Sequence, residues 1–300
     1  MSEIKNPEIL LKTRLDKNDY DAIKKLEEIC IRHDETSLKL ELDYKLSVSS
    51  PKAMEKVYIN EFMFREEGIL VGYLGICDFG GSEIELNGMV HPDYRRKGVF
   101  SKLFSLASAE WQNRNSSTML LLTDKNSQAG TNFIKSTGAS YNHSEYDMVL
   151  NMDKDIKRRL NTVRLRKSTA DDAEEAARQN LIYFNMEFTE EDNVETTDGS
   201  YSNITYIAEE NSTSVGKVRT ELNNGRGGIF GLGVLPEFRG KGYGREILTM
   251  AIEELKKNKA GEIFLQVLTD NSNALNLYKS CGFEERYTME YYAIRKKEDL

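Results

Sequence analysis

Apolar positions along this chain follow two periods, one helical and one typical of strands. Directly after Gly244, one apolar face at helical spacing contains Ile247, Leu248, Ala251, Ile252 and Leu255. Shorter apolar runs, I-F-G-L-G-V ending at Val234 and I-F-L-Q-V-L from Ile263 to Leu268, indicate buried strands. The order of these elements favours a mixed α/β layer fold over a doubly wound one.

Each half of the chain predicts the same series of elements. In the first half, T-R-L-D precedes an amphipathic helix from Asn18 to Cys30. In the second half, V-R-L-R from Val163 predicts a short strand, and S-T-A-D then starts a helix that runs through Arg178. Strands, a loop with its helix, and a further strand and helix follow in both halves. The final strands are predicted at Tyr146–Leu150 and Tyr287–Ile294.

A constant offset relates the two halves. Adding 144 to a position in the first half gives the matching position in the second for Gly72, Val90, Pro92, Arg95, Lys97, Gly98 and Gly138. Coincidental glycines would not keep one offset over such a distance, so we interpret the chain as a tandem duplication. The polar segment from Asn151 to Asn161 predicts the boundary, which gives domains at 1–152 and 162–300.

The segment from Val234 to Gly244, V-L-P-E-F-R-G-K-G-Y-G, has the features of an anion site. A predicted strand, a glycine turn and a helix N-terminus follow one another there. Free backbone N–H groups and the positive end of the helix dipole can hold a pyrophosphate. Arg239 and Lys241 add positive charge. The glycine spacing matches neither a Walker A loop nor a dinucleotide-binding fingerprint.

A second motif follows the strand at Ile263–Leu268: Asn271-x-x-Ala274-x-x-Leu277-Tyr278-x-x-x-Gly282-Phe283. Together with R-x-x-G-x-G at Arg239–Gly244, this motif resembles the two signatures of the GNAT N-acetyltransferase superfamily, in family order. Because the pattern occurs twice, the resemblance covers the whole chain. The layout is similar to tandem members such as mycothiol synthase, which combine two such units with an active C-terminal one.

This resemblance implies an α/β fold: a tandem GNAT fold in which each domain has a mixed, mostly antiparallel sheet flanked by helices. It also implies acetyl-CoA as co-substrate and direct transfer of its acetyl group, in a ternary complex, to a primary amine of a small molecule or peptide. The alternative is a non-catalytic acetyl-CoA-binding sensor or scaffold. A pure binder has less need of the Tyr278 phenol, whereas the lack of an acid on Ile229–Val234 favours the sensor.

The resemblance gives each motif residue a role. Backbone groups around Val234 would hold the pantetheine, Asn271 would orient it, and Tyr278 would protonate the departing thiolate. The pyrophosphate would bind the amides of Arg239, Gly240, Lys241, Gly242, Tyr243 and Gly244. Glu221 is the candidate general base, and Glu187 and Glu190 are the other carboxylates in reach of a substrate wall.

Each of these side chains also has a structural interpretation. Asn271 suits a helix N-cap, Tyr278 suits a core aromatic on an apolar helix face, and Glu221 suits a solvated carboxylate at a strand end. The segment with Glu187 and Glu190 resembles an exposed loop with a helix start. The complete motif around Asn271 and Tyr278 is what favours function for those two residues.

The two halves differ at the residues that carry chemistry. The matching position of Tyr278 is Ile134, and that of Asn271 is Ser127. Phe100 stands in the first loop where a second glycine or alanine is usual. The backbone amides survive this change, so CoA binding there is possible, and crowding of the cofactor by the Phe100 ring is the alternative. We therefore assign catalysis to the second half and expect the first half to be degenerate.

Composition narrows the partners. The chain has 300 residues, of which 39% are hydrophobic and 30% charged, as in globular proteins with two domains. A formal net charge of −8 argues against nucleic-acid binding and mildly favours cationic small substrates. Three cysteines without C-x-x-C spacing and three isolated histidines predict neither a disulfide framework nor a metal site. With no signal-like N-terminus and no membrane-length apolar run, we expect a cytoplasmic protein without a membrane partner.

Overall fold

The computed structural model describes residues 4–47, 56–154, 156, 162–184, 193–195, 199 and 201–296. The chain forms two compact units. Unit 1 consists of Met1–Ser144 and Met289–Leu300, and unit 2 consists of Glu145–Thr288. In the described part of the chain, no helix is both long enough and apolar enough to cross a bilayer.

Unit 1 is built on a mixed sheet with the strand order β1-β2-β3-β4-β5-β13. The strands are β1 (Pro7–Lys12), β2 (Glu61–Glu66), β3 (Ile69–Cys77), β4 (Glu83–Val90), β5 (Thr118–Asp124) and the part of β13 (Phe283–Arg295) that lies in this unit. All neighbouring strands are antiparallel except β4 and β5, which are parallel.

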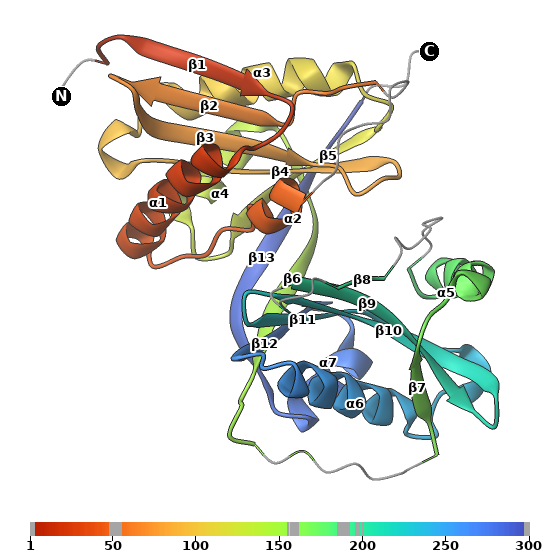
Figure 1. Ribbon diagram of the computed structural model, residues 1–300. Helices are drawn as coiled ribbons and strands as arrows, with labels where there is room; N and C mark the ends of the chain where they lie inside the picture. The colour runs from red at the N-terminus through yellow and green to blue at the C-terminus, as the bar shows by residue number, and fades with distance from the viewer. Residues whose placement is uncertain are drawn as a thin grey trace. The chain divides into compact units, whose positions relative to one another are not determined.

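Helices cover both faces of the unit 1 sheet (Figure 1). The helices are α1 (Lys17–Asp34), α2 (Leu42–Ser47), α3 (Val99–Gln112) and α4 (Gln128–Thr137). Along β3, Tyr73 packs in the cluster with Ile23 of α1, whereas Leu74 packs in the cluster with Leu103 of α3. This alternation along one strand places α1 and α3 on opposite faces.

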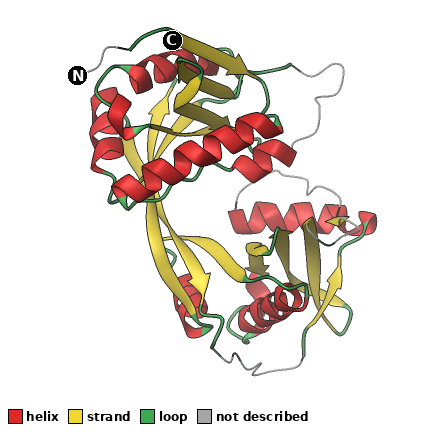
Figure 2. Cartoon of the chain, turned by 60° about the vertical axis from the view of Figure 1, so that its left-hand side comes forward, coloured by secondary structure: helices red, strands yellow, loops and turns green. Residues whose placement is uncertain are grey.

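Unit 2 repeats this design with the strand order β6-β12-β11-β10-β9-β7. Its strands are the unit 2 part of β6 (Ser140–Leu150), β7 (Arg164–Lys167), β9 (Tyr201–Glu210), β10 (Thr213–Asn223), β11 (Arg226–Val234) and β12 (Glu262–Leu268), and β8 (Val194–Glu195) pairs with β9. Again one pair is parallel, here β11 and β12. The expected fold class, a mixed and mostly antiparallel sheet with flanking helices in each half, is confirmed (Figure 2).

The helices of unit 2 are α5 (Ala173–Phe184), α6 (Tyr243–Lys257) and α7 (Ser272–Ser280). The apolar face predicted for α6 is the buried one: all five of its residues belong to the unit 2 core and are at most 2% exposed. Periodicity therefore predicted both the helix and the side that packs on the sheet.

The first helix of each unit begins with a capping box. Asp16 caps α1 reciprocally with Asp19, and Thr169 caps the 3₁₀ turn before α5 reciprocally with Asp172. The predicted helix starts are thus confirmed. T-R-L-D follows the end of β1 at Lys12 and supplies the bend and the cap before α1.

The final strands of the two halves are exchanged between the units. Residues Glu145–Val149 of β6 pair with β12 in unit 2, and Met289–Arg295 of β13 pair with β5 in unit 1. The compact units therefore do not coincide with the expected ranges 1–152 and 162–300. Of the expected boundary segment 151–161, only residues 151–154 and 156 are described.

A shortened chain tests this exchange. A chain that ends at Thr288 lacks the strand that pairs with β5, so β5 becomes a sheet edge in unit 1. We expect the amides of Thr118–Asp124 to lose protection in hydrogen–deuterium exchange read by mass spectrometry. A chain that ends at Lys296 keeps all of β13 and is the matched control. Equal protection of β5 in both chains would contradict the observed pairing.

Candidate functional site

In unit 2 the predicted anion loop joins β11 to α6 through a 3₁₀ turn at Pro236–Phe238. Gly240 and Gly242 have φ of +77° and +91°, a region that side chains disfavour, and Gly242 is the N-cap of α6. The helix bonds begin with Arg245 and Glu246, whose amides donate to the Gly242 carbonyl. The preceding amides belong to the first turn of the helix, where the dipole favours an anion.

Side chains of the loop mainly brace it. Arg239 Nε donates to the Val234 carbonyl at 3.0 Å, and the Lys241 ammonium lies 5.1 Å from the centre of the Phe238 ring. The Tyr243 side chain is buried and its hydroxyl donates to Glu210 of β9. Tyr243 can therefore contact an anion in the loop only through its backbone amide.

Next to this loop, the two parallel strands separate. β11 and β12 pair over Arg226–Ile229 and Glu262–Leu265, whereas β11 continues to Val234 and β12 to Leu268. Strands that stop pairing leave backbone N–H and C=O groups for a ligand. Unit 1 has the same geometry, because β4 and β5 pair over Glu83–Leu86 and Thr118–Leu121 and then separate.

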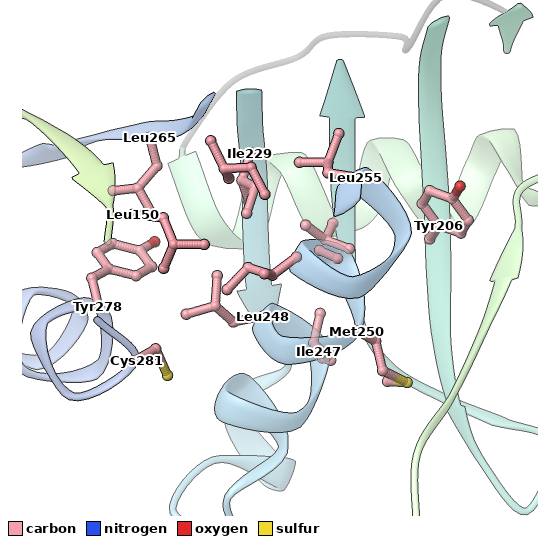
Figure 3. Close-up of a cluster of buried hydrophobic side chains, with 14 of the residues drawn as sticks. Leu150, Tyr206, Ile229, Ile247, Leu248, Met250, Leu255, Leu265, Tyr278 and Cys281 are labelled. Carbon is pink, nitrogen blue, oxygen red and sulfur yellow. The ribbon is translucent and has the colours of Figure 1, made fainter. Parts of the chain in front are cut away.

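Tyr278 lies on α7 in the core of unit 2, 8% exposed (Figure 3). Its ring is 6.0 Å from that of Phe283, centre to centre. Desolvation raises the pKa of the phenol to about 12, so the hydroxyl keeps its proton at neutral pH. Tyr278 is therefore both a core aromatic and a buried proton donor.

The other predicted side chains lie on separate elements. Asn271 is the N-cap of α7, and its Oδ1 accepts from the Ala274 amide at 3.1 Å. Glu221 is half-buried on β10 and pairs with Gly228 of β11. Gly228 directly precedes Ile229, which is the last residue of β11 that pairs with β12. Glu187 and Glu190 lie outside the described residues.

The sequence analysis missed Tyr183 of α5. Its ring lies against Gly233 of β11, so close that a Cβ built on this glycine would be 2.2 Å from Cδ2. The charge of Arg239 acts on the Tyr183 phenol, whose pKa is raised mainly by burial. Tyr183 thus lies at the open end of β11, near the loop. A glycine one residue before Val234 was the only sequence signal for it.

Unit 1 contains a cavity of about 950 Å³ at its own strand separation. It reaches from Val99 and Phe133 on the α3 side to Cys30 and Leu38 on the α1 side. Phe100 packs edge-on against Phe133 at 4.6 Å and so forms part of the wall, leaving the cavity open. That its bulk crowds a bound cofactor stays a prediction.

Two polar groups of this cavity are notable. Arg95 is held by Asp34, with both terminal nitrogens at 2.7 Å from its carboxylate, and by the Val90 carbonyl at 3.0 Å from Nε. The Nδ2 of Asn87 is buried and has no hydrogen-bond partner among the described residues. Such a donor is costly to leave unpaired and suits a ligand carbonyl. Within the described ranges, no group of three His, Cys, Asp or Glu side chains could hold a metal ion.

A family model matches the C-terminal half. Residues 170–283 match the family described as "Acetyltransferase (GNAT) family". These residues belong to the GNAT acetyltransferase family. The matched range includes the glycine loop, the separated strands and α7 of unit 2.

Curated relatives match part of this chain. The uncharacterized N-acetyltransferase YobR of Bacillus subtilis is 34% identical over 87 residues, which is 29% of this chain and 34% of that protein. The [ribosomal protein bS18]-alanine N-acetyltransferase of Haemophilus ducreyi is 31% identical over 85 residues, 28% of this chain and 57% of that protein. The chain thus spans about a third to a little over half of their length.

Solved structures extend the likeness to the whole chain. A GCN5-related N-acetyltransferase from Sphaerobacter thermophilus has a TM-score of 0.72 at 16% identity, over 97% of this chain and 98% of that one. A tandem GNAT protein from the clavulanic acid biosynthesis pathway has a TM-score of 0.71 at 14% identity, over 98% of this chain and all of that one. At such identities the likeness concerns the fold, which is the tandem GNAT fold.

Substitution of Asn271 separates its two interpretations. Asn271→Ala removes the N-cap of α7 and should lower the free energy of unfolding by about 1 kcal/mol. Asn271→Ser keeps a capping oxygen but lacks the amide. If Asn271 also orients acetyl-CoA, the serine variant should keep its stability in urea and lose affinity in calorimetry. Unchanged affinity in Asn271→Ser would restrict this residue to capping.

Proposed function

We propose that unit 2 transfers an acetyl group from acetyl-CoA to a primary amine of a small molecule or peptide, directly and within a ternary complex. The observation that carries the proposal is the separation of β11 and β12 next to a glycine loop at the N-terminus of α6. An elongated, doubly charged carrier fits this arrangement: its arm between the strands and its pyrophosphate on the loop.

In this proposal the backbone does most of the binding. The amides from Gly240 to Gly244 bind the pyrophosphate, and backbone groups near Val234 hold the pantetheine. The predicted contribution of the Arg239 amide is not kept, because this amide already donates to the Pro236 carbonyl at 3.2 Å. Arg239 contributes by its charge and by fixing the Val234 carbonyl. An amide at the open end of β11 could polarise the acetyl oxygen as charge develops on it. Nδ2 of Asn271 would orient the arm while its Oδ1 caps α7.

The proposed proton transfers use Tyr278 and Glu221. Glu221 accepts the proton of the attacking amine. Thiols have pKa values near 8.5, so a phenol with a pKa of about 12 does not give up its proton fully to a thiolate at equilibrium. Tyr278 acts by donating a hydrogen bond to the sulfur as the C–S bond breaks, where charge develops.

The acceptor is proposed as a chemical class, a primary amine. One relative is named for an alanine of ribosomal protein bS18, and an N-alpha-acetyltransferase of Sulfurisphaera tokodaii is 34% identical over 68 residues. Both names favour a peptide N-terminus, whereas the net charge of −8 suits any cationic amine. A cytoplasmic setting belongs to the same proposal.

Unit 1 is a second candidate, as a non-catalytic acyl-CoA-binding module. Its cavity of about 950 Å³ lies at the separated ends of β4 and β5 and supports binding. Ile134 occupies the place of Tyr278 and offers no proton. Unit 1 would then be degenerate for catalysis and competent for binding.

Tyr278→Phe tests the catalytic proposal. The ring and its packing remain, and only the hydroxyl is lost, so turnover should fall about a hundredfold while the dissociation constant for acetyl-CoA stays within twofold. Thiol release with a panel of peptide N-termini and polyamines measures turnover, and calorimetry measures affinity. Ile134→Val in unit 1 is the matched control. Full turnover in Tyr278→Phe would remove the hydroxyl from the mechanism.

Stoichiometry tests where acetyl-CoA binds. We expect two sites per chain by calorimetry, of which Arg239→Ala weakens one and Arg95→Ala the other, each by tenfold or more, because charge and strand-end brace are lost together. A single site that only Arg239→Ala affects would rule out binding by unit 1. Wild-type affinity in Arg239→Ala would rule out the proposed role of this arginine.

A further inference from the structure

At one pair of matching positions, the side chains of the two units differ in size. The capping residues Asp16 and Thr169 start the first helix of each unit and are 153 residues apart. The same spacing relates Cys30 on α1 to Tyr183 on α5. A small thiol in one unit therefore stands where the other unit has a large aromatic ring.

Both side chains reach the open end of the strand that precedes the loop. The Cys30 thiol donates to the Val90 carbonyl at 3.5 Å, and Val90 is the last residue of β4. The Tyr183 ring lies on Gly233, the residue before the end of β11. By the offset of 144, Gly233 matches Met89 of unit 1, so the larger helix residue faces the smaller strand residue.

Tyr183 is held in place by buried partners. Its hydroxyl donates to Gln179 Oε1 at 2.9 Å, and Gln179 is fully buried. The Gln179 amide donates in turn to Glu175 at 2.6 Å and to the Ser214 hydroxyl on β10 at 2.9 Å. A ring fixed by such a network occupies a defined volume and does not rotate away at low cost.

In unit 1, Met89 fills part of the corresponding volume, and the cavity takes up the space beside it. The cavity of about 950 Å³ is lined by both Cys30 and Met89, and it continues to Leu38 beyond them. Its other wall contains Phe100, Phe104 and Phe133. At the α1 end, apolar Cys30, Leu38 and Met89 line the cavity together with polar Thr36 and Ser37, and the apolar part of this lining favours an aliphatic group.

We propose that this helix position sets the length of the acyl chain in each unit: Tyr183 restricts unit 2 to acetyl, and Cys30 leaves unit 1 open to a longer, apolar acyl chain. The inference rests on the proposed binding of acyl-CoA at both strand separations. It makes Tyr183 a residue that determines specificity through volume and takes no part in the chemistry.

Acetyl-CoA and octanoyl-CoA are the probes, titrated into the full chain by calorimetry. Octanoyl has six more methylenes than acetyl, and each that is buried adds about fourfold in affinity, or 0.8 kcal/mol. The wild-type chain should bind one octanoyl-CoA tightly, in unit 1. Tyr183→Cys, which gives unit 2 the residue of unit 1, should add a second octanoyl-CoA site. Cys30→Tyr should remove the octanoyl-CoA site of unit 1 and keep acetyl-CoA binding in unit 2.

Milder variants cover the possibility that Cys30→Tyr fails to fold. Cys30→Met should weaken the binding of octanoyl-CoA by unit 1 about tenfold or more. Tyr183→Ala should add a second octanoyl-CoA site, as Tyr183→Cys does, without introducing a thiol. Gln179→Leu, which removes the anchor of the ring, should give a partial gain for octanoyl-CoA. Circular dichroism and retained acetyl-CoA binding report on folding.

Three results would overturn the inference. An octanoyl-CoA stoichiometry that stays the same in Tyr183→Cys and Tyr183→Ala, with acetyl-CoA still bound by unit 2, contradicts the role of Tyr183 and leaves the proposed function standing. Absence of any acetyl-CoA site that Arg239→Ala weakens contradicts both together. Equal binding of octanoyl-CoA by both units of the wild-type chain also excludes the size difference.

Discussion

In each unit, two parallel strands are hydrogen-bonded over four residues and then diverge, and the candidate sites depend on this divergence. Beyond the last pair, backbone groups of β4 and β11 lose their neighbour on one side. Each strand then passes through a 3₁₀ turn into a helix whose N-cap glycine has a positive φ. Unpaired strand groups and free helix amides are thereby brought together at the same edge of the sheet, and a ligand can satisfy both.

Exchange of the final strands makes the two halves of the chain depend on each other. Unit 1 completes its sheet with residues from the C-terminal end, since Thr118 pairs with Arg295. Unit 2 begins with residues of the first half, since Glu145 pairs with Leu268. Such distant pairings close large loops and are formed late and slowly in folding. The duplicated chain therefore does not consist of two independent copies.

Comparison of the units within one chain separates scaffold from chemistry. Ser127 caps α4 through its hydroxyl, as Asn271 caps α7 through its amide oxygen, so capping explains an oxygen at this position and not the choice of asparagine. Ile134 and Tyr278 are both buried, so packing explains an apolar side chain there and not the hydroxyl. The groups that unit 2 has in addition are the Asn271 amide and the Tyr278 phenol.

The sequence by itself determined the duplication, the order of helices and strands, the glycine turn before α6 and the GNAT resemblance that the family model bears out for residues 170–283. These features depend on local periodicity, on glycines that need positive φ, and on short fixed spacings, all of which the linear chain carries. The tertiary structure decided which strands pair, and so which residues form each unit, because an exchanged strand has the same pattern as one that stays. It also decided the packing of Tyr183 on Gly233 and the open cavity beside Cys30. Volume at a site depends on side chains that meet from distant elements, and no local pattern records how closely they approach.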